Sequence, residues 1–260
     1  MLWDPSQYAR YGSERNRPFF DLLGQVAADT PGSVVDLGCG SGELTAALAQ
    51  RWPGAMIRGL DSSAEMIERS SAYSSDRVTF GLAEAADFAA SGVDVLISNA
   101  LLQWVPDHGS LLTRWASELN PGGWLAFSVP DNFHSPSHVL MRELAESARW
   151  APMLTGVLRH LDAVSPAADY LALLNSTGLR TSAWQTRYLH VLAGPDPVLE
   201  WVRGTGLRPV LATLSTADAA EYQASYGALL HEAYPERDFG TVFPFLRTFV
   251  VAHKATGGQP

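Results

Sequence analysis

A glycine-rich stretch near the amino terminus places the strongest constraint on how this chain folds. It reads VVDLGCGSG over residues 34–42, and it joins a short apolar run to a segment with helical spacing. Glycines at positions 38, 40 and 42 let the backbone turn tightly and approach a ligand where a Cβ atom would clash. The pattern therefore predicts a strand, a tight turn that faces a small ligand, and a helix.

Two acidic residues indicate what kind of ligand this turn accepts. Asp36 stands two residues before the first glycine, where it would repel a pyrophosphate and attract a cation. The glycine spacing also differs from the dinucleotide fingerprint, which disfavours an NAD-dependent oxidoreductase. Asp61 closes the next apolar run, where a carboxylate can accept both hydroxyl groups of a ribose. A nucleoside that carries a positive charge fits both acids.

The first half of the chain alternates β-branched runs with amphipathic helical segments, which is typical of a parallel sheet covered by helices on both faces. The predicted strands are 33–37, 55–60, 78–82, 93–98 and 123–129. The predicted helices are a leader at 13–28 and segments at 43–51, 63–72, 84–89 and 110–119. Ser62 and Glu65 form a capping-box pattern before the helix at 63–72.

Two irregular stretches interrupt the second half of the chain. Both are too long for plain connections, so we interpret them as mostly helical lid insertions. Between and after them, strands are predicted at 181–191 and 249–253. The predicted organisation is a leader and ligand-binding core at 1–129, a first lid at 130–164, a core helix and strand at 165–193, a second lid at 194–240, a last core strand at 241–254 and a disordered tail at 255–260.

Composition disfavours several classes of protein. Of 260 residues 47% are hydrophobic and 17% charged, and no run reaches the roughly 18 apolar residues of a spanning helix. The net charge of −9 disfavours nucleic acid and membrane surfaces as partners and favours small ligands. Cys39 is the single cysteine and has no metal-ligand spacing around it, so neither an internal disulfide nor a metal is expected. The amino terminus lacks a secretory pattern, and we expect a cytoplasmic protein.

The glycine loop with its two acids resembles the S-adenosylmethionine-dependent methyltransferases of the Rossmann-like class. Over nearly its whole length the chain is also similar to the trans-aconitate 2-methyltransferase family. This narrower resemblance is carried by WDPS at 3–6, SERNRP at 13–18, DLGCG at 36–40, RWP at 51–53, DSS at 61–63, QWVPDH at 103–108, PDN at 130–132, HVLMRE at 138–143 and TGLRP at 205–209. It implies an α/β fold with a seven-stranded methyltransferase sheet, an antiparallel last strand, helices on both faces and two mostly helical lids.

The resemblance implies S-adenosylmethionine as cofactor and assigns residues to its methionine part. Asp36, Gly38 and Gly40 would line this part of the cofactor. Asn99, at the end of the fourth strand, would approach the amino group through its main-chain carbonyl. Arg15 in the leader is the candidate for binding the carboxylate, with a solvent-exposed helix arginine as the alternative.

The nucleoside part is assigned to residues after the second and third strands. Asp61 would accept the ribose hydroxyls, and Ser62 and Met66 would lie beside the adenosine. Glu84 and Ala85 would meet the adenine edge. Because aspartate is usual at position 84, the longer Glu84 shifts the expected adenine contact toward the backbone of Ala85.

In this family a carboxylate oxygen of the acceptor takes the methyl group, so the resemblance implies a monomethyl ester of trans-aconitate and S-adenosylhomocysteine as products. A carboxylate is already ionised at neutral pH, so no catalytic base is expected. The protein would orient the reacting atoms and exclude water from them.

Arginine side chains are the natural means of holding the other carboxylates of a small anionic acceptor. Arg142, Arg208 and Arg247 are the first candidates, because each lies in a family-like segment beside an insertion or the last strand. Arg17 in the leader is a fourth candidate. Surface ion pairs, for example with Glu143, are the alternative interpretation of each arginine.

Three further residues are candidates for contact with the acceptor. Trp104 follows the fourth strand and would orient the acceptor, or it packs between core and lid. Asn132 and His138 would donate hydrogen bonds to the acceptor, or they stabilise a turn and the fold. Arg114, on a core helix, is assigned to solvent.

Two other functions stay open at this point. One is a methyltransferase for another small carboxylic acid or a natural-product hydroxyl. The other is a non-catalytic binding protein that keeps the nucleoside site. The sequence predicts no oligomeric state.

Overall fold

The computed structural model describes residues 16–158 and 163–256. They divide into two compact units, the first formed by 16–130, 164–186 and 247–256 and the second by 131–158, 163 and 187–246. The divisions at 186/187 and 246/247 lie inside two long strands, β6 (Leu179–Leu192) and β8 (Gly240–Lys254), whereas the sequence placed them at 193/194 and 240/241. The reason is that each of these strands continues from one unit into the other.

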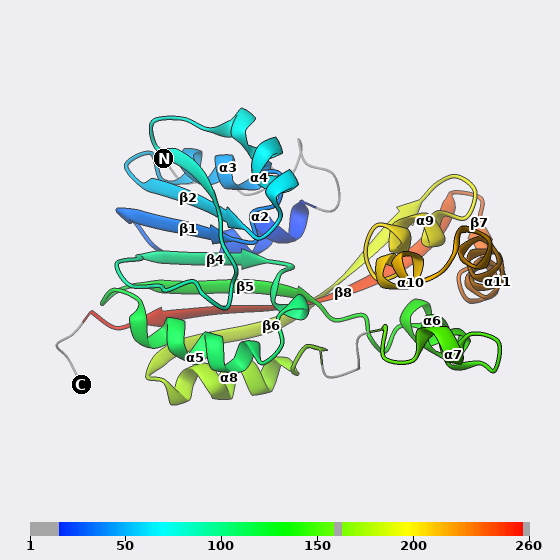
Figure 1. Cartoon of the computed structure of the whole chain (residues 1–260). Coiled ribbons are helices and arrows are strands. Elements are labelled where there is room, and N and C mark those ends of the chain that lie inside the picture. The colour runs from blue at the N-terminus through cyan, green and yellow to red at the C-terminus, as the bar shows by residue number, and fades with distance from the viewer. Residues whose placement is uncertain (1–15, 159–162, 257–260) are drawn as a thin grey trace. The chain divides into compact units, whose positions relative to one another are not determined.

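The strands form one mixed sheet. They are β1 (Ser33–Leu37), β2 (Met56–Asp61), β3 (Val78–Leu82), β4 (Val95–Asn99), β5 (Trp124–Pro130), β6 (Leu179–Leu192), β7 (Glu236–Arg237) and β8 (Gly240–Lys254). Their order is β3-β2-β1-β4-β5-β8-β6, and the short β7 pairs with β8 off this path. β1 to β5 are parallel to one another, whereas β8 is antiparallel to β5 (Figure 1). This seven-strand path confirms the predicted fold class.

The helices of the first unit cover both faces of the sheet. They are α2 (Arg17–Leu23), α3 (Glu43–Arg51), α4 (Ala64–Ser70), α5 (His108–Glu118) and α8 (Ala167–Ser176), with 3₁₀ turns at Ser71–Tyr73 and Leu102–Trp104. From β1 the chain winds first toward β3 and then back toward β5, and right-handed crossovers place the two sets of helices on opposite faces. α5 and α8 accordingly lie side by side (Figure 1), whereas α3 and α4 pack against β2 and β3.

The reversal of strand order next to β1 determines where a ligand can bind. In an open parallel sheet, ligands bind beyond the carboxyl ends of the strands at the point where the order reverses. Here that point lies between β1 and β4, which are hydrogen-bonded neighbours. The glycine loop follows directly after β1, so the fold places it at this position.

The predicted helix at 84–89 is wrong, because only one turn forms there. The N–H groups of Asp87 and Phe88 both donate to the carbonyl of Glu84. Later carbonyls accept hydrogen bonds from a side chain of α5. The Arg114 guanidinium donates to the carbonyl oxygens of Ala86 and Phe88, both at 2.8 Å. Arg114 is therefore a structural residue and not the solvent-facing one that we expected.

The predicted capping box is displaced by one residue. Ser63, and not Ser62, caps α4, and its hydroxyl accepts a hydrogen bond from the Met66 N–H at 3.4 Å. The cause is Asp61, whose carboxylate accepts the Ser63 N–H at 2.9 Å and turns the chain before the helix begins.

Other boundaries differ only in length or fall partly outside the structure. β6 and β8 are longer than the predicted strands at 181–191 and 249–253. The leader helix is observed as α2, and the predicted residues 13–15 lie outside the described residues, as do 257–260 of the predicted tail. In the described ranges, no helix has both the length and the apolar character to cross a membrane.

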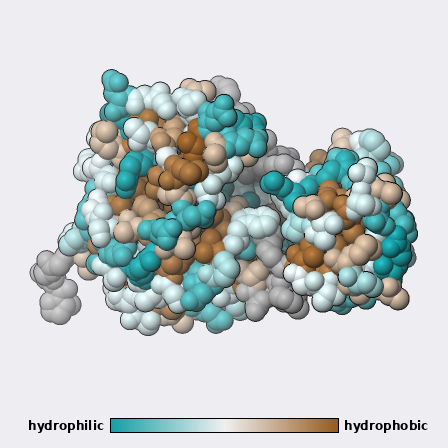
Figure 2. All heavy atoms as spheres, viewed as in Figure 1, coloured by the Kyte–Doolittle hydropathy of each residue, from teal (hydrophilic) through white to brown (hydrophobic). Residues whose placement is uncertain are grey.

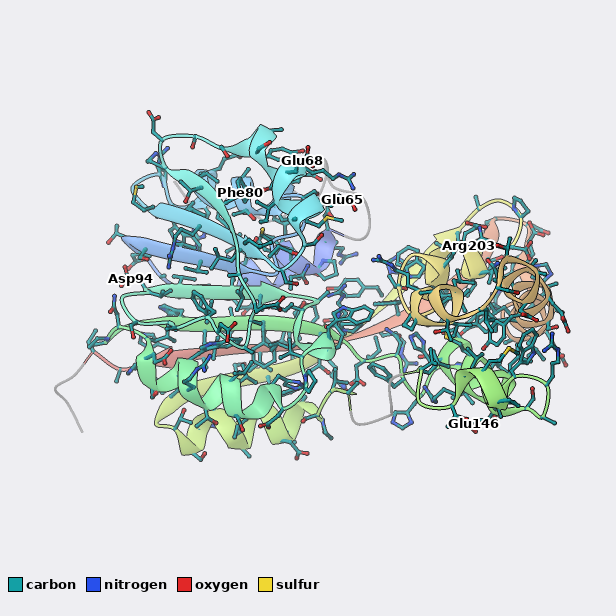
Figure 3. All side chains as sticks on the ribbon, in the orientation of Figure 1. Glu65, Glu68, Phe80, Asp94, Glu146 and Arg203 are labelled. Carbon is teal, nitrogen blue, oxygen red and sulfur yellow. The ribbon has the colours of Figure 1, made fainter. Side chains whose placement is uncertain are left out.

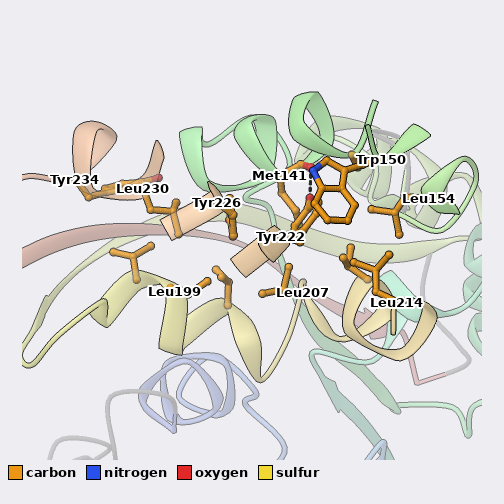
Figure 4. Close-up of a cluster of buried hydrophobic side chains, with 14 of the residues drawn as sticks. Met141, Trp150, Leu154, Leu199, Leu207, Leu214, Tyr222, Tyr226, Leu230 and Tyr234 are labelled. Atoms are coloured by element: carbon orange, nitrogen blue, oxygen red, sulfur yellow. Dashed lines mark hydrogen bonds between the residues drawn. The ribbon is translucent and has the colours of Figure 1, made fainter. Parts of the chain in front are cut away.

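The second unit is built around a helical core of its own. Its helices are α6 (Pro136–Glu146), α7 (Ala151–Leu154), α9 (Pro197–Arg203), α10 (Arg208–Thr213) and α11 (Thr216–Ala233). Tyrosines of α11 fix it to the backbone of α6: the Tyr222 hydroxyl donates to the Met141 carbonyl at 2.7 Å (Figure 4), and the Tyr226 hydroxyl donates to the Ser137 carbonyl at 2.6 Å. Burial raises the pKa of both phenols, so they remain donors at neutral pH.

At the opposite end of the sheet from the glycine loop, Asp94 joins the starts of three strands. Its carboxylate accepts the N–H groups of Gly32 at 2.8 Å and Ser33 at 3.0 Å, and the side-chain amide of Asn120 at 2.7 Å. The position of Asp94 is labelled in Figure 3. Burial acts to raise the pKa of Asp94, but these three hydrogen bonds outweigh it and leave the pKa below its ordinary value.

We expect Asp94→Ala to lower the free energy of unfolding by about 1 to 3 kcal/mol, because three donors lose their acceptor. A lowered pKa in the folded state means that this stabilisation is present above the unfolded pKa and disappears as the pH falls through the folded one. Urea unfolding at pH 7.5 and at pH 2.5, well below the ordinary pKa of 3.8, measures both effects. Asp76→Ala is the control, since Asp76 is exposed and has no side-chain bond within the described residues. Equal stability of the two variants at pH 7.5 would contradict the assignment.

Candidate functional site

The loop after β1 is packed tightly at two of its glycines and open at the third. The N–H groups of Gly38 and Cys39 donate to the Leu60 carbonyl at 2.7 and 3.0 Å, which fixes the loop to β2. A Cβ atom at Gly38 would lie 2.9 Å from the Leu101 Cβ. At Gly40, where φ is +54°, a Cβ atom would meet nothing within 4 Å. Gly40 is thus the point of the loop where a ligand has room to approach the backbone.

Asp36 is a buried carboxyl group beside this opening. It is 2% exposed, and the Thr45 hydroxyl donates to it at 2.6 Å. Burial raises its pKa to about 6, against the hydrogen bond from Thr45 and with a further increase from Asp61. Burial and the same two acids raise the pKa of Cys39 to about 12. Among the residues that the structure describes, no cation pairs with Asp36.

Asp61 connects the end of β2 to the glycine loop. Its two carboxylate oxygens accept the N–H groups of Gly40 and Ser63, both at 2.9 Å. Each oxygen keeps a further lone pair, so the carboxylate can still accept two hydroxyl groups of a ligand. Ser62 is exposed beside it, and Met66 is half-buried on α4. The three residues predicted for the ribose and adenosine therefore lie together.

The predicted adenine contacts follow β3 on the next strand. The Glu84 side chain is exposed and has no bond to another described residue, whereas Ala85 is buried in the turn that replaces the predicted helix. Because β2 and β3 are parallel neighbours, this turn begins at the same edge of the sheet as Asp61. The structure thus brings the predicted cofactor residues of β1, β2 and β3 to one edge. Arg15 lies outside the described residues.

At the end of β4, Asn99 is held by a buried cation. Its side-chain oxygen accepts the Ser128 hydroxyl at 2.6 Å and the Arg247 guanidinium at 3.0 Å, and the same guanidinium nitrogen donates to the Ser128 oxygen at 3.1 Å. Arg247 is 9% exposed. Two predicted residues, one assigned to the cofactor and one to the acceptor, are therefore in direct contact.

The backbone after Asn99 adopts a conformation that is rare for a residue with a side chain. Ala100 has φ of +59°, which costs about 1 kcal/mol or more. Two hydrogen bonds hold it there: its N–H donates to the Ser128 carbonyl at 2.8 Å, and its carbonyl accepts the Gln103 side-chain amide at 2.6 Å. Gln103 is buried and was not predicted as a site residue. Strain held by specific bonds at the carboxyl end of a central strand is typical of a functional position.

The other predicted acceptor residues of the first unit are at the surface. Trp104 ends the 3₁₀ turn after β4 and is 46% exposed, so it is not a core residue of its unit. Arg17 is exposed on α2, where its guanidinium lies 3.6 Å from the Asp21 carboxylate. An exposed pair of this kind contributes little to stability.

In the second unit, two predicted acceptor residues have structural partners. Asn132 is 1% exposed and pairs with the backbone of Leu246 like a strand residue: its amide nitrogen donates to the carbonyl at 3.0 Å and its oxygen accepts the N–H at 2.8 Å. This is the turn role considered as its alternative. The Arg142 guanidinium donates to the Phe133 carbonyl. Burial lowers the pKa of Arg142, against Glu146 and then Glu143.

The remaining two predicted residues are more accessible. His138 is half-buried on α6, its ring packs edge-on against Phe133 at 5.7 Å, and it lines a small pocket with Arg142 and Gly206. Arg208 begins α10, is exposed, and has no side-chain bond to any residue in the described ranges.

Sequence reasoning missed Thr45 as well as Gln103. Thr45 is fully buried on α3 and provides the hydrogen bond to Asp36. A signal was available, because a helix that starts after a glycine loop turns its first inward-facing residue toward the preceding strand. Gln103 has no comparable signal, since its role depends on the unusual backbone at Ala100.

Comparison with known proteins identifies the class. Residues 8–182 match a family model described as a methyltransferase domain, so the chain belongs to the methyltransferases and the predicted class is confirmed. Its curated relatives are trans-aconitate 2-methyltransferases. The chain is 52% identical to that of Streptomyces avermitilis, covering 97% of both chains, and 48% identical to that of Streptomyces coelicolor, covering 98% of this chain and 88% of that one. With that of Mycobacterium tuberculosis the identity is 43%, over 96% of both chains.

Solved structures agree in fold. A S-adenosylmethionine-dependent methyltransferase from Mesorhizobium loti has a TM-score of 0.51 at 18% identity, covering 93% of this chain and 99% of that one. Phosphoethanolamine N-methyltransferase 2 of Haemonchus contortus, solved with S-adenosyl-L-methionine, has a TM-score of 0.53 at 18% identity. That likeness covers 90% of this chain, which spans about half the length of the nematode protein (51%).

Proposed function

We propose that this chain is an S-adenosylmethionine-dependent carboxyl O-methyltransferase that esterifies one carboxylate of trans-aconitate, with the monomethyl ester and S-adenosylhomocysteine as products. The observation that supports this most is the 43 to 52% identity to curated trans-aconitate 2-methyltransferases over 96 to 98% of the chain. That identity extends through the second unit and is not limited to the glycine loop. A small anionic carboxylate also suits the several arginines that have no acidic partner among the described residues.

The residues at the carboxyl edge of β1 and β4 fit the methionine part of the cofactor. When bound, S-adenosylmethionine supplies an electrophilic methyl group on a sulfonium. Asp36 is a buried carboxyl without a cationic partner in the described residues, and the open backbone at Gly40 leaves space beside it. Asp36, Gly38 and Gly40 would hold this part, with Asn99 at the amino group through its carbonyl and Arg15 at the carboxylate.

The residues after β2 and β3 fit the nucleoside part. Asp61 would accept the ribose hydroxyls with the lone pairs that Gly40 and Ser63 leave available. Ser62 and Met66 would lie beside the adenosine, and Glu84 with Ala85 would meet the adenine edge.

The acceptor needs orientation and a dry environment rather than a base. Its carboxylate is ionised at neutral pH, and loss of water from a reaction in which opposite charges combine lowers the barrier. Trp104 would orient the acceptor, and Arg17, Arg142, Arg208 and Arg247 with Asn132 and His138 remain candidates for its other groups. Of these, Arg208 has the most freedom to bind an anion, since Asn132 and Arg142 already bond to backbone groups.

The test is transfer of a labelled methyl group from S-adenosylmethionine to trans-aconitate, with cis-aconitate, citrate, isocitrate and buffer alone in parallel. We expect selective, base-labile labelling of trans-aconitate, because an ester hydrolyses in base. Labelling of a different acid, or none together with tight binding of S-adenosylhomocysteine, would reject the acceptor. Neither cofactor binding nor labelling would reject the enzyme class. The cytoplasmic location stays a prediction from the sequence.

A further inference from the structure

The second unit contains a pocket that the predicted site residues do not account for. Its volume is about 570 Å³. Its apolar floor is formed by Val242, Pro244 and Leu246, which alternate along β8 and therefore share one face of that strand. Phe243 and Phe245 occupy the opposite face, where they join the hydrophobic core of the unit. The strand thus supports the pocket on a rigid base.

Positive side chains line this pocket from two strands. Arg187 comes from β6 and Arg237 from β7, and both are exposed to solvent. Neither guanidinium has a hydrogen bond or an ion pair with any residue between 16 and 158 or between 163 and 256. His134 also lines the pocket, and Asp131 is an acid in the lining. With Asp131 ionised, two guanidinium groups still leave the lining with a net positive charge.

Two other arginines of the same unit pair with acids. Arg149 lies 2.6 Å from Asp218 and 3.0 Å from Glu221, and Arg203, labelled in Figure 3, pairs with Glu200. In a chain of net charge −9, acidic partners are abundant. On the face shown in Figure 2, hydrophilic side chains border the hydrophobic ones of this unit. The two arginines of this pocket thus lack acidic partners among the described residues, although the chain contains many acids.

We infer that this pocket binds a small polycarboxylate anion, with Arg187 and Arg237 each holding one carboxylate. A guanidinium matches a carboxylate through two parallel N–H donors, and the separate strands present two such groups to one ligand. The inference rests on the proposed function in one respect: the first ligand it predicts is trans-aconitate, through carboxylates that do not react. The same chemistry would accept another di- or tricarboxylate at the pocket.

Measurements of equilibrium binding distinguish trans-aconitate from other di- or tricarboxylates as the ligand of this pocket. Calorimetric titration of trans-aconitate into protein saturated with S-adenosylhomocysteine should give an affinity that falls about 10- to 100-fold in Arg187→Gln and in Arg237→Gln. Binding of S-adenosylhomocysteine itself should not change. Arg187→Lys should fall between wild type and Arg187→Gln, because charge is kept and the paired donors are lost. Arg180→Gln, an exposed and unpaired arginine at the other end of β6, should bind as wild type.

The outcomes also separate this inference from the proposed function. If trans-aconitate is methylated but both glutamine variants bind it within twofold of wild type, the inference is overturned and the function stands. If trans-aconitate does not bind, the same titration with citrate, isocitrate, cis-aconitate and succinate decides. If one of these acids binds and its binding requires both arginines, the inferred anion pocket is supported although the proposed acceptor is not. If none of them binds, the inferred anion pocket is overturned.

Discussion

Asp36→Asn is expected to make the ligand-free protein more stable at neutral pH while abolishing tight cofactor binding. Burial is the main cause of the raised pKa of Asp36, which the structure places at about 6 instead of the ordinary 3.8. Ionised at pH 7.5, the carboxylate therefore destabilises the folded state by about 3 kcal/mol relative to a protonated group. Asparagine carries no charge and can still accept the Thr45 hydroxyl, so this cost disappears.

The sign of the pH dependence follows from the direction of the shift. A folded-state pKa above the unfolded value means that the protonated group favours folding at low pH and that this advantage is lost as the pH rises through about 6. Wild type should thus lose stability relative to Asp36→Asn between pH 4 and pH 7. Urea unfolding at four pH values across this range measures the difference. A difference independent of pH would contradict a buried carboxyl that titrates there.

The effect on cofactor binding has the opposite sign. If the cationic part of the cofactor neutralises Asp36, loss of the carboxylate should lower the affinity for S-adenosylhomocysteine about 100-fold, because a buried charge-assisted hydrogen bond is removed. Calorimetry on the folded variant gives this value directly. Asp76→Asn, at an exposed position, is the matched control and should alter neither quantity. A variant that gains stability and keeps full affinity would place the cofactor elsewhere.

Alanine at the three glycines 40, 42 and 92 should produce three different results, although all have positive φ. Gly42→Ala is expected to be the most destabilising, by about 2 to 5 kcal/mol, because crowding adds to the backbone cost. Its Cβ atom would lie 2.7 Å from the Ser70 Cβ and 2.8 Å from the Phe80 ring. Phe80, labelled in Figure 3, is also close to Gly59, where an added Cβ atom would lie 2.5 Å from the same ring.

Gly40→Ala and Gly92→Ala should each lower the free energy of unfolding by about 1 to 2 kcal/mol. This is the cost of placing a residue with a side chain at positive φ, since neither Cβ atom would meet anything within 4 Å. They should differ in function. A methyl group at Gly40 occupies the open space beside Asp36, and S-adenosylhomocysteine should bind at least about tenfold more weakly. Gly92 lies in a turn before β4, so Gly92→Ala should bind as wild type.

Urea unfolding and calorimetric titration of the three variants together test this assignment. Equal stability of Gly42→Ala and Gly92→Ala would mean that the loop is less tightly packed than the structure shows. Equal affinity of Gly40→Ala and Gly92→Ala would mean that the cofactor does not approach the backbone at Gly40.

Local patterns predicted the elements around the cofactor site well. β1, β3 and α3 begin and end at the predicted residues, because each has a clear period and an unambiguous start or stop. The same holds for the position of Asp36 and Asp61, since residues at the ends of parallel neighbouring strands must lie at one edge of the sheet. These inferences need only short-range sequence and the geometry of the sheet.

Predictions failed where a distant partner decides the local structure. Residues 84–89 have helical spacing, but they form a single turn, and Arg114 and Trp115 on α5 donate to the Phe88 carbonyl. Arg247 was predicted from its segment alone, and the structure buries it against Asn99 and Ser128. Asn132 was a candidate for the acceptor, yet Leu246 takes both ends of its amide. None of these partners lies close in the sequence.

The sequence by itself determined the class of fold, the glycine loop with its two acids, and the resemblance to methyltransferases, because each depends on residues that are adjacent or follow a fixed period. Only the tertiary structure decided that Asp36 is buried with Thr45, that Ala100 is held at positive φ, and that Arg187 and Arg237 share a pocket. Those features arise where segments far apart in the chain meet. Burial and the pairing of charges depend on these long-range contacts, so no local sequence pattern encodes them.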